Sequence, residues 1–145
     1  MVELVITMVV IGIMAAVAVP RFFDGNVFQA RGFADQLKAT MRYAQKMAIA
    51  KNRFICVAFT GTSITLTIDG TMPDASHTSA ACPGDPLASP TGQTPYILSA
   101  SGAVTLSGGS VFYFSPQGRA STAQNITVNG YAIPIAVEAE TGYVH

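Results

Sequence analysis

The sequence has little charge, no tryptophan, and only two cysteines and two histidines among its 145 residues. Charged residues make up 11% of the chain, whereas soluble domains usually contain about 25%. The few cysteines and histidines form no Cys-x-x-Cys or Cys/His cluster, so we expect no metal site and no cofactor. The sequence also lacks a Gly-x-Ser-x-Gly elbow and a glycine-rich phosphate loop. These absences argue against an enzyme.

The shortage of charge is greatest near the N-terminus, where residues 4–19 carry no charged side chain. As a helix, this run would be about 24 Å long, which approaches the ~30 Å hydrocarbon core of a bilayer. A secretory signal peptide would have basic residues before its apolar run, whereas here the acidic Glu3 directly precedes the run. We therefore expect residues 1–24 to form a hydrophobic transmembrane helix and residues 25–145 to form a globular head.

Three residues of the N-terminal segment are candidates for a role in assembly. Glu3 is costly in an apolar helix unless it is paired or protonated, although it could also be a solvated charge at the helix end. Gly12 either weakens the helix or allows another helix to approach closely. Pro20 removes a backbone hydrogen bond, which predicts a kink or local unwinding there.

The head is predicted to begin with an amphipathic helix over residues 25–52, followed by a β-rich region over 53–145. Apolar residues recur at helical spacing and should pack on a sheet: Phe33, Leu37, Met41, Ala44 and Ala48. Strands are expected at 54–59, 64–69, 96–98, 103–106, 111–114, 125–129 and 131–137. A proline-rich stretch over 70–95 predicts a long loop, and Asn129-Gly130 predicts a hairpin turn. The fold class is therefore α+β.

Charge is divided unevenly between the two parts of the head. Residues 21–53 contain seven of the eight basic residues and two acidic ones, whereas residues 54–145 contain one basic and five acidic residues. The basic helix face either is simply solvated or meets acidic heads or anionic lipid in an assembly.

The N-terminal residues resemble a known family. The strings Val2-Glu3-Leu4-Val5-Ile6 and Ile11-Gly12-Ile13-Met14-Ala15-Ala16-Val17-Ala18-Val19-Pro20 are similar to the start of type IV pilins and type II secretion pseudopilins. The resemblance implies that prepilin peptidase cleaves the precursor after a glycine and methylates the new N-terminus. Met1 stands where the family has an apolar residue after Gly-Phe-Thr, so we expect further in-frame codons upstream for a short basic leader.

Later motifs resemble the GspH/FimT-type pseudopilins and minor pilins. These motifs are Arg42-Tyr43-Ala44-Gln45-Lys46, Phe114-Ser115-Pro116-Gln117-Gly118-Arg119 and Thr141-Gly142-Tyr143-Val144. Pro20-Arg21-Phe22-Phe23-Asp24 is similar to relatives encoded with mannose-sensitive haemagglutinin pili. The resemblance implies a pilin fold and a structural subunit of a type IV pilus or type II secretion pseudopilus. It also implies an inner-membrane protein with a periplasmic head, whose partners are other pilin subunits, the inner-membrane assembly platform and the lipid bilayer.

Two further features of the head keep alternatives open. Cys56 and Cys82 are either two separate thiols or, as we favour for an exported head, a disulfide that ties the long loop to the sheet.

Some FimT-like minor pilins bind DNA through a Gly-Arg-x-Arg motif, and here Gly118-Arg119-Ala120-Ser121 lacks the second arginine. The presence of a single basic residue in 54–145 argues against nucleic-acid binding. A DNA-binding minor pilin and a plain single-span periplasmic protein remain the alternatives.

Overall fold

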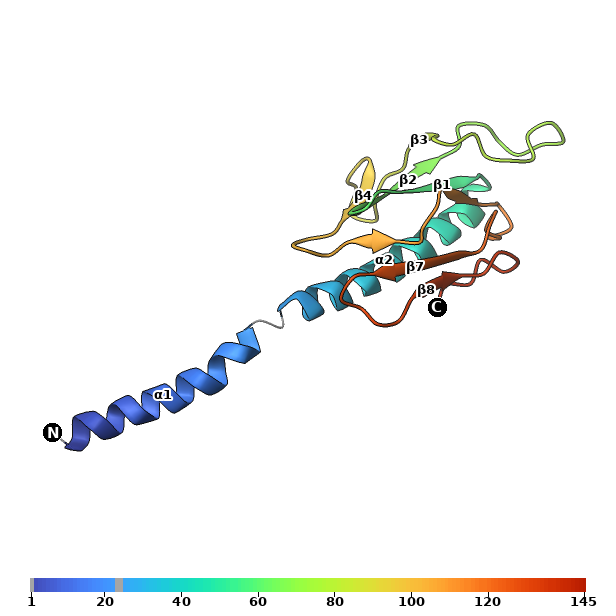
Figure 1. Ribbon diagram of the computed structural model, residues 1–145. Coiled ribbons are helices and arrows are strands. Elements are labelled where there is room, and N and C mark those ends of the chain that lie inside the picture. The colour runs from blue at the N-terminus through green and yellow to red at the C-terminus, as the bar shows by residue number, and fades with distance from the viewer. Residues whose placement is uncertain (1, 23–24) are drawn as a thin grey trace.

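A computed structural model of the chain describes residues 2–22 and 25–145. Two helices come first, α1 (Val2–Phe22) and α2 (Gly25–Lys51), and Figure 1 shows α1 extending away from the head. Pro20 does not end α1, because the helix continues to Phe22. One proline removes a single backbone hydrogen bond, and the remaining bonds keep the neighbouring residues helical.

Helix α2 packs its apolar stripe against the sheet, as its sequence period predicts. Phe33 is 5% exposed, and the other four residues of the predicted stripe are fully buried. The buried face also includes Ala30 and Ala34, whose small side chains bring α2 close to its neighbours. The helix ends where Asn52 adopts a left-handed backbone conformation, with φ at 51°.

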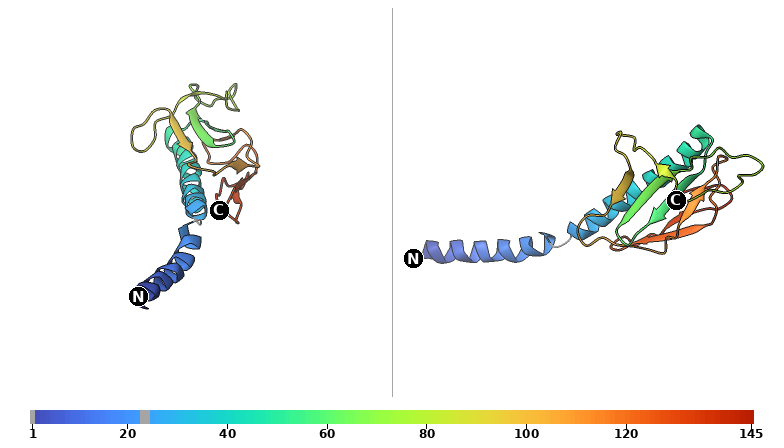
Figure 2. Two further views of the ribbon diagram at one scale, coloured as in Figure 1. Left: turned by 60° about the vertical axis from the view of Figure 1, so that its left-hand side comes forward. Right: turned by 90° about the horizontal axis from the view of Figure 1, so that it is seen from above.

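The strands form two antiparallel sheets that lie against α2 (Figure 2). The first contains β1 (Ile55–Phe59), β2 (Ser63–Ile68), β3 (Asp85–Pro86), β4 (Tyr96–Ser99) and β6 (Phe112–Phe114). Its order is β3-β2-β1-β6, and β4 also pairs with β2. The second sheet contains β5 (Leu106–Ser107), β7 (Gln124–Val128) and β8 (Ile135–Val137) in the order β5-β7-β8. The predicted α+β class with antiparallel strands is confirmed.

The predicted turn at Asn129-Gly130 is confirmed and lies between β7 and β8, which pair in antiparallel fashion, but the connection is longer than a two-residue hairpin loop. The amide of Tyr131 donates to the carbonyl of Val128, and Gly130 has φ at 85°, so the two residues form a turn. A two-residue type I′ hairpin would need positive φ at Asn129 as well, and Asn129 does not have it. The chain therefore continues through a loop, and β8 begins only after Pro134, which has no amide hydrogen for a ladder.

Candidate functional site

Over residues 2–16, where its side chains are described, helix α1 presents apolar side chains on all sides and buries none of them against the head. Every side chain from Val2 to Ala16 is exposed, including ten large apolar ones: Val2, Leu4, Val5, Ile6, Met8, Val9, Val10, Ile11, Ile13 and Met14. Contiguous apolar surface of this kind marks a site of protein or membrane contact. Within the part of the chain that the structure describes, no helix is both long and apolar enough to cross a membrane.

The predicted assembly residues lie along α1, away from the head. Glu3 is exposed, and none of the ion pairs formed within residues 2–22 and 25–145 includes it. A methyl group added at Gly12 would meet no atom within 4 Å, so this side of the helix is open. Pro20 lies in α1, but its side chain is outside the described residues. The structure thus leaves the surface around Glu3 and Gly12 free for another chain.

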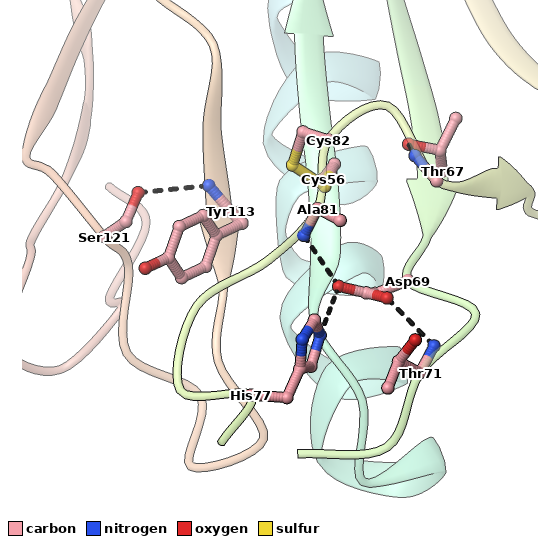
Figure 3. The surroundings of a disulfide bond; sticks show 10 residues. Cys56, Thr67, Asp69, Thr71, His77, Ala81, Cys82, Tyr113 and Ser121 are labelled. Carbon is pink, nitrogen blue, oxygen red and sulfur yellow. Dashed lines mark hydrogen bonds and ion pairs between the residues drawn. A yellow bond between two sulfur atoms is a disulfide. The ribbon is translucent and has the colours of Figure 1, made fainter. Parts of the chain in front are cut away.

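A disulfide joins the long loop to the first sheet (Figure 3). Cys56 lies in β1 and is 1% exposed, whereas Cys82 lies in the loop that follows β2. Their Cα atoms are 5.8 Å apart, although the residues are separated by 26 positions in the sequence. The bond holds the segment before β3 against the outer face of the sheet.

A buried carboxylate beside this disulfide organises the same loop. Asp69 is 2% exposed; it accepts hydrogen bonds from the backbone amides of Thr71 and Ala81 and faces His77 Nε2 at 2.9 Å (Figure 3). Burial alone would raise the pKa of Asp69, but the two amides and His77 outweigh it, so the pKa is lowered. The sequence pattern does not reveal this group, because Asp69 ends the strand predicted over 64–69 while its partners His77 and Ala81 lie in the loop predicted over 70–95.

The GspH/FimT-like motifs, far apart in the sequence, meet at one place on α2. Gln45 Nε2 donates to the carbonyl oxygens of Gly118 at 2.9 Å and Thr141 at 3.0 Å. Arg42 Nη2 donates to the carbonyl of Val144 at 3.0 Å. Gly142 has φ at 63° and packs directly on the Gly118 carbonyl, which leaves no room for a side chain. These contacts, which we call the C-terminal brace, fix the second sheet and the C-terminus to α2.

Arg119 lies on an exposed turn beside the brace. Its guanidinium forms an ion pair with Glu140, and its backbone carbonyl accepts a hydrogen bond from Ser115. The pairing partly neutralises the one basic side chain of residues 54–145. Among the described residues, no hydrogen bond or ion pair links the Arg119 side chain to Glu3 or to the cysteines.

The comparisons with known proteins agree with this description. The family model of the type II transport protein GspH matches residues 34–141. Two crystal structures of the type IV minor pilin FimU from Pseudomonas aeruginosa are similar to the chain, each with a TM-score of 0.51, at 13% and 12% sequence identity. The similarity covers 79% of this chain and 90% and 85% of the two FimU chains, which confirms the predicted pilin fold. A comparison with curated protein sequences gives no match.

The family match includes most of α2, both sheets, and Gln45 and Gly118 of the C-terminal brace. It therefore covers the greater part of the chain and both hydrogen bonds that Gln45 donates in the brace. The chain belongs to the GspH family of type II transport proteins.

Proposed function

We propose that the chain is a minor pilin or pseudopilin, a structural subunit that joins the filament of a type IV pilus or a type II secretion pseudopilus through α1. The observation that carries this proposal is the helix itself. Ten large apolar side chains are exposed along one helix, while the head buries its own core. Such a helix is stable only when a bilayer or other apolar helices cover it. The family match and the FimU-like fold support the same role.

In this proposal the subunit resides first in the membrane and then in the filament. Residues 1–24 first hold the protein in the inner membrane as a single span, with the head of residues 25–145 in the periplasm. Prepilin peptidase processes the precursor, and the inner-membrane assembly platform then transfers the subunit into the filament. When the subunit passes from the membrane to the filament, the uncharged run of residues 4–19 moves from one apolar environment to another. The transfer therefore loses little hydrophobic free energy.

Glu3 selects the axial register of the subunit in this proposal. An unpaired carboxylate among apolar helices is costly, and its proposed partner is the positively charged N-terminal amine of a neighbouring subunit. Only one axial position brings the two groups together, so the pair rewards the correct register. Gly12 lets a neighbouring helix approach α1 closely, since nothing in the chain occupies the space beside it. Pro20 frees a backbone carbonyl near the end of α1 and allows the helix to adjust there.

The test compares Glu3→Gln and Glu3→Ala with the wild-type protein at matched expression. Membrane insertion should be intact, because removing a charge makes the helix more apolar. The ratio of sheared-filament to membrane-bound protein should fall by about a hundredfold or more, because leaving one member of a buried pair unpaired costs about 3–5 kcal/mol. An unchanged ratio would mean that Glu3 is a solvated helix-end charge.

Asp35→Asn is the matched control, because Asp35 is exposed on α2 and this substitution also removes one negative charge. It should leave the ratio unchanged. If the wild-type protein itself is absent from sheared filaments while the other pilins are present, the chain is a single-span periplasmic protein and the proposal fails.

A further inference from the structure

A groove lies between the C-terminal part of α2 and the loop that follows β2. Its volume is about 560 Å³. Its α2 residues are Tyr43, Met47 and Lys51, which belong to the C-terminal half of the helix. Figure 1 shows that this half is the one farther from α1. Met72, Leu87 and Ala88 of its lining belong to the loop that carries Cys82, whereas the cysteines themselves, the brace and the assembly residues of α1 do not line it.

The floor of the groove is apolar and adaptable. Met47, Ile68 and Leu87 form it, and Met72 stands at its edge with 60% of its surface exposed. Methionine side chains are flexible and polarisable, so they adjust to the shape of an inserted apolar group. Tyr43 closes one side and is held by a hydrogen bond from its hydroxyl to the carbonyl of Ala88.

Two positive charges border this floor, and neither has a carboxylate partner. Arg53 Nη1 donates to the carbonyl oxygens of Asp69 and Gly70, which leaves its charge uncompensated. Lys51 is exposed at the last turn of α2. No ion pair within residues 2–22 and 25–145 includes either cation.

The neighbouring carboxylates form no ion pair with Lys51 or Arg53 in the described residues. Asp69 turns its carboxylate toward His77 and the amides of Thr71 and Ala81. Asp85 in β3 lies beside Gly70, but it forms no ion pair with Arg53 or Lys51. The groove therefore combines an apolar floor with two cations that no group of the chain neutralises in the described residues.

We propose that this groove binds an acidic segment of a partner polypeptide. One apolar side chain of the partner enters between Met47 and Met72, and adjacent carboxylates of the partner face Lys51 and Arg53. The apolar floor accounts for the anchor and the two cations account for the acidic flanks, since complementary charge at an interface rim selects the partner. A free anion would leave the floor uncovered. This interaction does not depend on the proposed role of α1.

The experiment uses the full chain in a mild detergent, with ¹³C-labelled methionine methyl groups observed by NMR. The probe is a synthetic peptide, Gly-Ser-Asp-Leu-Glu-Asp-Ser-Gly. Its first control has amides in place of the carboxylates, and its second has serine in place of leucine. The acidic peptide should shift the Met47 and Met72 signals saturably and leave buried Met41 unchanged. Both control peptides should bind about tenfold more weakly or not at all.

Two variants test the groove residues. Lys51→Glu and Met72→Asp change exposed side chains, and an unchanged Met41 signal verifies that each variant is folded. Both should weaken binding of the acidic peptide by about tenfold. Arg31→Glu makes the same charge change near the other end of α2 and should have no effect.

Three results would overturn the proposal. The first is equal binding of the acidic and amide peptides, which would show that charge has no part. The second is equal loss of binding in Arg31→Glu, which would indicate general electrostatic attraction. The third is a shift of the Met8 and Met14 signals in place of Met47 and Met72, which would place the peptide on α1.

Discussion

Removing the disulfide should strongly destabilise the head. The variant replaces both Cys56 and Cys82 with alanine, which avoids placing a hydroxyl group without a partner at the buried Cys56 position. The bond closes a loop across 26 sequence positions. In the chain-entropy description, freeing a loop of this length in the unfolded state lowers the free energy of unfolding by about 3.5 kcal/mol. For a head of this size, that corresponds to a melting temperature lower by roughly 10–15 °C.

The assay is equilibrium unfolding of the head, residues 25–145, by urea and by heat, with and without a thiol reductant. The wild-type head in reductant should lose about as much stability as the double variant, and the variant itself should not respond to reductant. The loop is also held by the contacts of Asp69 and by β3. A loss below about 1 kcal/mol would show that these contacts already keep the loop ends together in the unfolded chain, and the loop-closure reasoning would be refuted.

Three other predictions concern the head. Asp69→Asn should lower the free energy of unfolding by about 1–3 kcal/mol near neutral pH. Because the pKa of Asp69 is lowered in the folded protein, the carboxylate stabilises the head above about pH 4, and this stabilisation is lost as the pH falls through the folded pKa. The urea midpoints of variant and wild type should therefore converge in acid. Gly142→Ala should lower the free energy of unfolding by more than about 2 kcal/mol in thermal or urea unfolding, since it combines an unfavourable φ with a clash against the Gly118 carbonyl. Gly61→Ala is the control and should change stability little, because a methyl group there meets nothing within 4 Å. Residues 25–145 alone should unfold cooperatively, because the stripe of α2 finds its sheet within the same segment; a broad transition without a baseline would contradict this.

The local patterns of the sequence were sufficient for most elements of the head. A helical period of apolar residues predicted the buried face of α2, and alternation predicted β2, because side chains on a helix or strand repeat at spacings set by local geometry. The long loop between β2 and β4 also follows from its prolines, although the short strand β3 within it does not. Two residues, Asp85 and Pro86, give no periodicity that could identify a strand.

Turn type and sheet partners required the tertiary structure. Asn129-Gly130 is compatible with several turns, and which one forms depends on where the following strand can pair. Here β8 pairs with β7 by residues 135–137, and the C-terminal segment then pairs with β8 through Ala136 and His145. The division of the strands into two sheets is a consequence of such long-range pairing, which no local pattern records.

The sequence by itself determined that the chain has an apolar N-terminal segment carrying Glu3 and Gly12, because hydropathy is a property of consecutive residues. It did not show that Gln45, Gly118 and Thr141 meet, that His77 lies against Asp69, or that Lys51 and Arg53 border an apolar groove. Each of these sites combines residues separated by intervening strands or loops. Their distances are set by how α2 packs on the sheets, and only the folded chain decides that packing.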